Sequence, residues 1–288
     1  MRTIPPDQLP INADGSIFHL HLKPEQLADK VVMMGDPERV PVVAAFFDST
    51  EFDLQSREFR TITGTYKGKR ITALSHGIGC DNIDIVMTEL DALANIDLQT
   101  REVKTDFRQL TLVRIGTCGG LQPFCPIGTY VISEISMGMD GLIFFYDKGD
   151  CISNEELSQK FLEYTGWNGS LAKPYFVDSD QELTERIGFD MIKGITISAS
   201  GFYGPQGRYV RLGLSHPEMN KLIESFEYKG LKIANYEMES AALSGLAGLM
   251  GHKALTACLV IAGRYSGGMK TDYKSSFDEL IRKVLDRI

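Results

Sequence analysis

Short runs of mostly apolar residues, spaced along the whole chain, are the feature that most restricts how this sequence can fold. Six runs have the length of a buried strand: Val31–Met34, Ile71–Leu74, Thr111–Ile115, Thr129–Ile132, Ile195–Ala199 and Ala254–Ala262. A strand that is apolar on both faces is covered on both faces, usually by helices. The pattern therefore predicts an α/β fold with a largely buried sheet.

Helical periodicity alternates with these runs. Apolar residues recur at helical spacing between residues 82 and 95. Ser275 or Ser276 could cap a last helix that buries Phe277, Leu280, Ile281, Val284 and Leu285.

No linker rich in Pro, Ser or Gly divides the chain, so we expect a single domain over residues 1–288. The polar stretch 146–185, which contains Trp167, is interpreted as a surface elaboration with one or two short helices.

Charge and cysteine usage exclude several classes of function. The net charge of −8 should repel nucleic acid and anionic membranes, so neither is an expected partner. An anion site must then be built from a few arginines.

The five cysteines have no metal-ligand spacing, and the segment 1–6 has no apolar signal core. We expect reduced thiols and a cytoplasmic location.

Two segments that follow predicted strands offer anion-binding groups. Gly35–Arg39 combines a close backbone approach with a charge, although an ordinary strand-to-helix turn has the same composition. In the segment Arg114–Gly120, Arg114 stands in an apolar strand and needs either a carboxylate or a bound anion. Thr117 and its neighbouring glycines could form a phosphate nest.

Two later segments offer groups that could hold a flat heterocycle and a sugar. Phe202–Arg208 joins an aromatic ring, the Gln206 amide and a guanidinium, which suit a flat heterocycle, and a Gly-Pro turn is the simpler interpretation. Asn235–Ser240 opens a helix with Glu237 and Glu239. Acids at a helix start also complement its dipole, but Glu239 could accept hydrogen bonds from two sugar hydroxyls. His76, His216 and His252 are interpreted as structural or surface histidines.

Taken in order, these segments resemble the uridine phosphorylase branch of the nucleoside phosphorylase family. The resemblance also includes Phe18-His19-Leu20, Ser56–Phe59 and Ile261–Arg264, and it covers most of the chain outside residues 146–185. It implies a mixed, partly barrel-like sheet flanked by helices, and a pentosyltransferase that cleaves uridine with inorganic phosphate to uracil and ribose 1-phosphate. Deoxyuridine and thymidine stay open as further substrates.

The resemblance also implies roles for individual residues. Phosphate would be held by Gly35, Arg39, Arg114 and Thr117, with Arg57 from a neighbouring subunit. Ribose would be held by Met238 and Glu239, with His19 from the neighbour. The base would meet Phe202, Gln206, Arg208, Glu237, Ile261 and Arg264, and the catalytic groups would be Arg208, Gln206, Glu239 and Arg264.

The same resemblance bears on assembly and cofactors. Shared sites imply a homodimer as the smallest active unit, and a hexamer stays open. No cofactor is implied, since phosphate is a co-substrate. A monovalent cation, with potassium as the candidate, is implied near Glu58, although Gly79–Asn82 departs from the family's usual Gly-Gly-Pro-Ser. The Gly204-Pro205 order is likewise reversed from the familiar Pro-Gly.

The choice of base can be argued from charge. A purine leaves easily when an acid protonates its N7, and purine-specific relatives carry an aspartate after the last core strand. The segment Val260–Arg264 has no acid, whereas Gln206 and Arg208 can stabilise the carbonyl oxygens of a uracil anion. Two alternatives remain: a nucleosidase that uses water in place of phosphate, and a non-catalytic nucleoside-binding protein.

Overall fold

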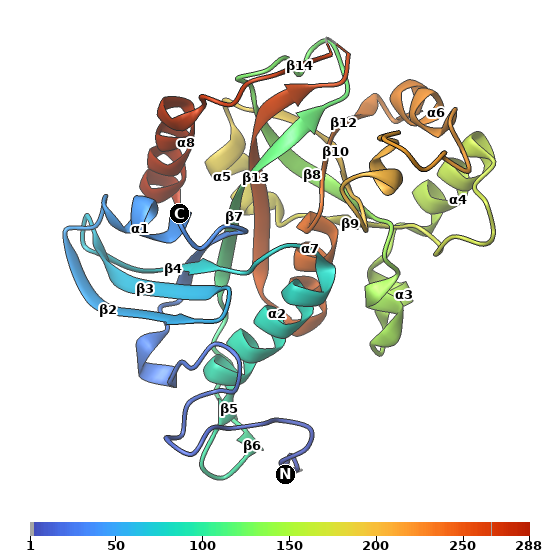
Figure 1. Cartoon of the computed structure of the whole chain (residues 1–288). Helices are drawn as coiled ribbons and strands as arrows, with labels where there is room; N and C mark the ends of the chain where they lie inside the picture. Colours follow the sequence, from blue (N-terminus) through green and yellow to red (C-terminus); the bar gives the residue numbers. More distant parts are fainter. Residues whose placement is uncertain (1–2, 266) are drawn as a thin grey trace.

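A closed ring of five strands forms the centre of the fold (Figure 1). The computed structural model describes residues 3–265 and 267–288; Met1 and Arg2, at the start of the segment where no signal is expected, lie outside them. The ring runs in the order β7, β13, β8, β10, β12 and back to β7. Its strands are β7 (Thr111–Gly120), β8 (Tyr130–Gly138), β10 (Ile192–Ser198), β12 (Leu231–Glu237) and β13 (Lys253–Gly263).

The sheet extends beyond the ring. From β7 it continues through β1 (Lys30–Met34), β4 (Lys69–Ser75), β3 (Phe59–Tyr66) and β2 (Ser49–Ser56). Short strands add to its margins: β9 (Tyr175–Asp178) on β8, β11 (Glu227–Tyr228) on β12 and β14 (Gly268–Met269) on β13. A separate hairpin joins β5 (Ile96–Asp97) to β6 (Glu102–Val103). Around the ring, β7–β13, β8–β10 and β10–β12 are parallel pairs, whereas β13–β8 and β12–β7 are antiparallel, so the sheet is mixed, as expected.

Helices cover the sheet in two layers with separate apolar cores. One layer packs α2 (Cys80–Asn95) beside α7 (Ser240–Met250), as Figure 1 shows. The other contains α1 (Arg39–Ala44), α5 (Gln181–Gly188) and α8 (Lys274–Arg287). The remaining helices are η1 (Pro24–Gln26), η2 (Leu142–Phe145), α3 (Gly149–Ile152), α4 (Glu155–Thr165), η3 (Gly204–Gln206) and α6 (Met219–Ser225). The predicted α/β fold with a mixed, partly barrel-like sheet is confirmed.

All six predicted strands are present, but β7 does not end where the sequence predicts. It continues from Ile115 through the glycines to Gly120. Gly119 and Gly120 pair with β12 and with β13 at once. A Cβ on Gly120 would collide with the carbonyl oxygen of Cys125, so only glycine fits this crowded closure. The segment Gly116–Gly120, for which the sequence predicts a phosphate-binding turn, is therefore part of a strand. Pairing with distant strands overrides the low strand propensity of glycine.

Residues 146–185 differ from the expected surface elaboration. They contain α3, α4 and most of α5, and β9 adds to the sheet. Phe161, Tyr175 and Phe176 are fully buried. Aromatic residues in a polar stretch carry the packing here, because each removes a large apolar area from water.

The last helix also differs in one detail. It begins at Lys274 with Tyr273 at the N-cap and no side-chain cap, so neither Ser275 nor Ser276 has the predicted role. Its predicted buried face is confirmed.

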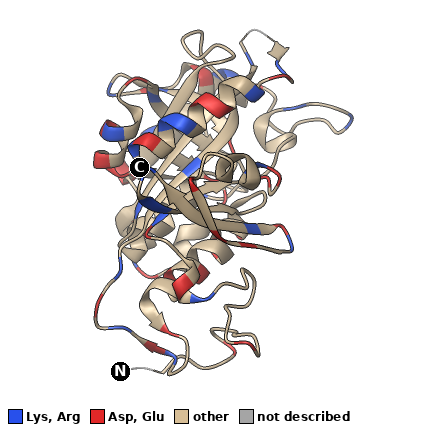
Figure 2. Cartoon of the chain, turned by 90° about the vertical axis from the view of Figure 1, so that its left-hand side faces the viewer, with Lys and Arg blue, Asp and Glu red and all other residues tan. Residues whose placement is uncertain are grey.

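Figure 2 shows acidic and basic side chains interspersed on the side of the molecule that carries α8. Lys283 and Arg287 of α8, for example, pair with Asp190. Among the described helices, none combines the length and the apolar content that crossing a bilayer would require.

Candidate functional site

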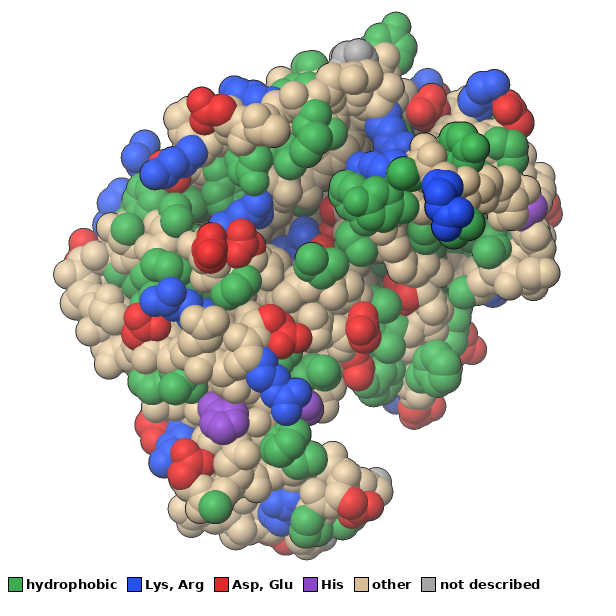
Figure 3. Space-filling model, in the orientation of Figure 1, with side chains coloured by type: hydrophobic (Ala, Val, Ile, Leu, Met, Phe, Trp, Pro, Cys, Tyr) green, Lys and Arg blue, Asp and Glu red, His purple; other side chains and the backbone are tan. Residues whose placement is uncertain are grey.

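A cavity of about 1110 Å³ opens where β1, β4, β12 and β13 end and beside the second half of β7. Figure 3 shows this face hollowed near its middle, with basic side chains inside the hollow and at its upper rim. Most of the predicted site residues line this cavity: Gly35, Arg39, Glu58, Arg114, Thr117, Phe202, Gln206, Arg208, Glu237, Met238, Glu239, Ile261 and Arg264.

Two predicted site residues lie outside the cavity lining, and these are the two assigned to a neighbouring subunit. The backbone N–H and the Nδ1 of His19 lie 2.9 and 2.7 Å from Oε1 of Glu89 in α2. Arg57, at the tip of the β2–β3 hairpin, places its Cζ 6.0 Å from the centre of the Phe18 ring. His19 and Arg57 are therefore held near one another, and neither lines the cavity of its own chain.

Arg114 lies at the floor of the cavity with only 5% of its surface exposed. Its Nη1 is 3.0 Å from Oε2 of Glu237, and its Nη2 contacts Glu239. The partner that the sequence requires is thus a pair of carboxylates. A buried charge without partners would cost several kcal/mol, so these acids allow Arg114 to remain inside.

Glu237 also organises the start of α7. Its carboxylate accepts hydrogen bonds from the backbone N–H of Glu239 and Ser240, and from the hydroxyls of Ser198 and Ser240 at 2.6 and 2.7 Å. The sequence suggests that Glu237 and Glu239 lie in the first turn of a helix, but the structure places both before that turn. Glu237 ends β12 and Glu239 is the N-cap of α7, because β12 pairs with β10 up to Glu237.

The charges at the cavity floor shift one another's pKa values. Burial raises the pKa of Glu239 above its usual value, although Arg114 opposes this shift. Burial alone would lower the pKa of Arg114, but Glu239 and Glu237 outweigh it and raise that pKa. Arg114 therefore stays charged, and Glu239 takes up a proton more readily than an exposed glutamate would.

The other end of the cavity is lined by aromatic rings and guanidinium groups. Arg208 stacks on Phe202, with its Cζ 3.7 Å from the ring centre, and its Nη1 donates to Oε1 of Gln206 at 2.6 Å. Arg264 lies over the ring of Tyr236 at 5.4 Å. Because Arg208 occupies the oxygen of the Gln206 amide, the amide nitrogen is left to donate. This end offers mainly donors, which suits a ligand with carbonyl or anionic oxygens.

The two arginines also affect each other. Burial lowers the pKa of Arg208, and the charge of Arg264 adds to that shift. Burial lowers the pKa of Arg264 as well, and its Nη2 is buried without a hydrogen-bond partner among the described residues. An unmet buried donor that belongs to a cavity residue favours an acceptor from a ligand.

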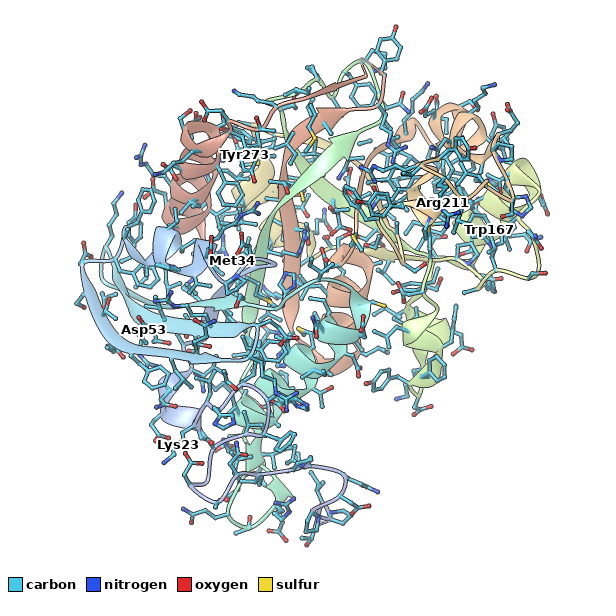
Figure 4. All side chains as sticks on the ribbon, viewed as in Figure 1. Lys23, Met34, Asp53, Trp167, Arg211 and Tyr273 are labelled. Carbon is cyan, nitrogen blue, oxygen red and sulfur yellow. The ribbon has the colours of Figure 1, made fainter. Side chains whose placement is uncertain are left out.

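Gly35 and Arg39 border the cavity on the side of α1 and α8. Arg39 Nη2 donates to the hydroxyl of Tyr273 at 3.0 Å, and its guanidinium lies 4.7 Å from the ring centre of Phe277. Figure 4 labels Tyr273 beside the start of α8, above Met34 at the end of β1. A Cβ on Gly35 would lie 3.0 Å from the carbonyl oxygen of Gly77, so glycine allows the two turns to approach closely.

The corner near Glu58 combines oxygen-bearing groups. Glu58, Ile78 and Asn82 all line the cavity, and Asn82 Nδ2 lies 3.4 Å from the carbonyl oxygen of Ile78. Carboxylate, carbonyl and amide oxygens are the donors that hard cations prefer. The donor types fit the predicted monovalent cation, which stays a prediction.

Several residues around the cavity are not predicted from the sequence. Tyr236 and Asn82 line it, and His76 lies directly behind Arg114. His76 follows β4, and a residue at the carboxyl end of a predicted strand is a candidate for a ligand site, so the sequence did contain a signal for His76. Tyr236 gave no such signal, because a tyrosine in an apolar strand is usually part of the core.

Comparisons with known proteins show the family to which the chain belongs. The family model described as "Phosphorylase superfamily" matches residues 29–287. A uridine phosphorylase of Thermococcus kodakarensis is 29% identical over 263 residues, which cover 88% of this chain and 80% of the relative.

Solved structures extend the comparison. A Trypanosoma brucei nucleoside phosphorylase with uridine phosphorylase activity superimposes with a TM-score of 0.87 at 30% identity, covering 97% of this chain and 98% of that one. A Toxoplasma gondii purine nucleoside phosphorylase in complex with immucillin-H has a TM-score of 0.65 at 21% identity, with 95% of each chain covered, and shows the shared fold alone.

Proposed function

Since this chain belongs to the phosphorylase superfamily, we propose that it cleaves uridine with inorganic phosphate to give uracil and ribose 1-phosphate. Membership places it among the nucleoside phosphorylases, which are pentosyltransferases. Two relatives that cover most of the chain, from Thermococcus kodakarensis and Trypanosoma brucei, are described by uridine phosphorylase activity and support the choice of uridine.

One observation carries the proposal: a single cavity joins a charged floor to an aromatic, donor-rich end. At the floor, Gly35, Arg39, Arg114 and Thr117 would bind phosphate, with Arg57 supplied by a neighbouring subunit. Two guanidinium groups from distant parts of the chain line one pocket, which supports an anion there. The overall charge of −8 makes such a focused site necessary.

Between these ends, Met238 and Glu239 would hold the ribose. Glu239 Oε1 accepts a hydrogen bond from the backbone N–H of Gly79 at 2.9 Å, which fixes the orientation of the carboxylate. Each carboxylate oxygen has a further lone pair for a sugar hydroxyl. His19 of the neighbouring subunit would approach the 5′-hydroxyl.

The base would lie at the donor-rich end, against Phe202 and Ile261. Gln206, Arg208 and Arg264 would meet the carbonyl oxygens of uracil. The segment Val260–Arg264 contains no acid that could protonate a purine N7, which favours a pyrimidine. Glu237 would act on the ligands indirectly, because its carboxylate holds Arg114 and the start of α7 in place.

These roles describe a reaction with little covalent chemistry for the protein to perform. Breaking the bond between C1′ and the base builds positive charge on the sugar and negative charge on the base. The phosphate, held under C1′, stabilises the sugar cation and then forms the new bond to C1′. The electron pair of the broken bond leaves on uracil, where Arg208 and its neighbours stabilise it.

A panel of nucleosides, assayed with and without phosphate for release of free base, tests the proposal. Uridine should be cleaved only when phosphate is present, and inosine should be cleaved far more slowly. The panel also contains deoxyuridine and thymidine. Equal rates of uridine cleavage without phosphate would identify a nucleosidase instead, and binding of uridine without turnover would identify a non-catalytic protein.

A further inference from the structure

His76 is a fully buried histidine that the proposed roles do not use. It follows the last residue of β4, and none of its surface is exposed. Its Nε2 lies 3.2 Å from Nε of Arg114, and its Cε1 would lie 3.8 Å from a Cβ placed on Gly35. The imidazole therefore sits between two segments that border the charged floor of the cavity.

The direction of the contact fixes the state of the ring. The Nε of an arginine always carries a hydrogen, so the His76 Nε2 must accept it and the ring hydrogen must be on Nδ1. Burial and the charge of Arg114 both lower the pKa of His76 well below its usual value. A neutral ring is the only form that can accept this hydrogen bond.

The guanidinium of Arg114 is held on three sides. Nε donates to His76, Nη1 faces Glu237 and Cys258, and one hydrogen of Nη2 is directed to Glu239. Arginine has five such hydrogens, so within residues 3–265 and 267–288 one hydrogen on Nη2 is left for a ligand in the cavity. The direction of that hydrogen depends on the plane of the guanidinium.

We propose that His76 is a positioning residue: by accepting from Nε of Arg114 it sets the guanidinium plane, so that the remaining Nη2 hydrogen points to phosphate. Glu237 and Glu239 both contact Nη atoms of Arg114. With these two contacts alone, the guanidinium plane could still rotate. The proposal rests on the proposed function, because it assumes that Arg114 meets phosphate.

Two amide variants separate this role from a loss of packing. In His76→Gln, the side-chain amide reaches about as far as Nε2 and can still accept from Arg114. In His76→Asn, the amide reaches only as far as Nδ1, and the acceptor is lost. We expect His76→Asn to raise the KM for phosphate about tenfold, with kcat and the KM for uridine within about twofold of wild type. In His76→Gln, the KM for phosphate should lie within about threefold of the wild-type value.

Binding of inorganic phosphate to the free protein, measured by calorimetry, supplies a readout that does not need uridine. His76→Asn should weaken it by the same factor. His252→Asn is the matched control, because His252 is also buried but contacts Leu110 and Asp91, whereas His76 contacts Arg114. It should leave phosphate binding unchanged.

The outcomes are distinguishable. If the wild-type protein binds no phosphate, the proposed function fails and the role of His76 fails with it. If it binds phosphate and both His76 variants bind equally well, or equally poorly, only the positioning role is overturned. The same holds if the uridine KM rises as much as the phosphate KM.

Discussion

Arg114 illustrates how a single residue can predict a site before its partners are known. An arginine in an apolar strand must be compensated, and the sequence leaves open whether a carboxylate or a bound anion does so. Glu237 and Glu239 supply that compensation. The result is a charged floor that is already balanced before any ligand arrives, so a phosphate must share Arg114 with two acids.

At the opposite end of the cavity, Arg208 has a more open role. It stacks on Phe202 and directs the Gln206 amide, but its charge is not paired with an acid in any described contact. Charge that develops on a leaving base is therefore the natural partner of this guanidinium.

We expect Arg208→Ala to reduce kcat/KM for uridine about a hundred- to thousandfold, the usual loss when one donor to a developing anion is removed. Steady-state kinetics on uridine checks it. Arg211→Ala is the control, because Arg211 is exposed in the loop that follows Arg208 (Figure 4) and does not line the cavity. The activity of this variant should match wild type. Near-normal activity of Arg208→Ala would remove this residue from the reaction.

Among the secondary-structure elements, β7 has the largest influence on the site. Its first half is an apolar strand between β1 and β13, and its second half closes the ring against β12. The change occurs at Gly116, over which the side chain of Arg114 folds back. A Cβ on Gly116 would lie 2.6 Å from Nη1 of Arg114 and 3.0 Å from its Cζ.

Gly116→Ala should therefore lower the free energy of unfolding by about 1–3 kcal/mol, because the added methyl displaces Arg114 from its carboxylate partners. Gly119→Ala is a matched control in the same strand, since the nearest atom to its Cβ would be a carbonyl oxygen at 3.8 Å. Its free energy of unfolding should change by less than about 0.5 kcal/mol. Denaturant unfolding of both variants measures the difference, and equal losses would contradict this account.

At the scale of the whole molecule, the remaining question is what completes the site. His19 and Arg57 do not line the cavity of their own chain, and contacts with Glu89 and Phe18 hold them elsewhere. This arrangement supports a homodimer in which each chain supplies these two residues to its neighbour. Whether dimers assemble further into a hexamer is a separate question.

Mixing two inactive variants tests the shared site. Arg57→Ala and Glu239→Gln subunits should each have low activity alone. A mixed dimer contains one intact site, so random mixing in equal amounts should restore activity in about a quarter of the sites. Phosphorolysis measured after unfolding and refolding the two variants together checks this. An absence of recovery, with dimers present, would argue against residues exchanged between subunits.

The sequence by itself determined the α/β class, the positions of the main strands and several of the segments that line the cavity. It could do so because burial on both faces, helical spacing and glycine or arginine after a strand are local patterns. The contact between His76 and Arg114 and the strand continuing through Gly116–Gly120 were decided only by the tertiary structure. Both depend on which distant segments meet: β12 closes the ring on β7, and β4 brings His76 behind Arg114. Contacts between residues far apart in sequence leave no periodic signal in the chain.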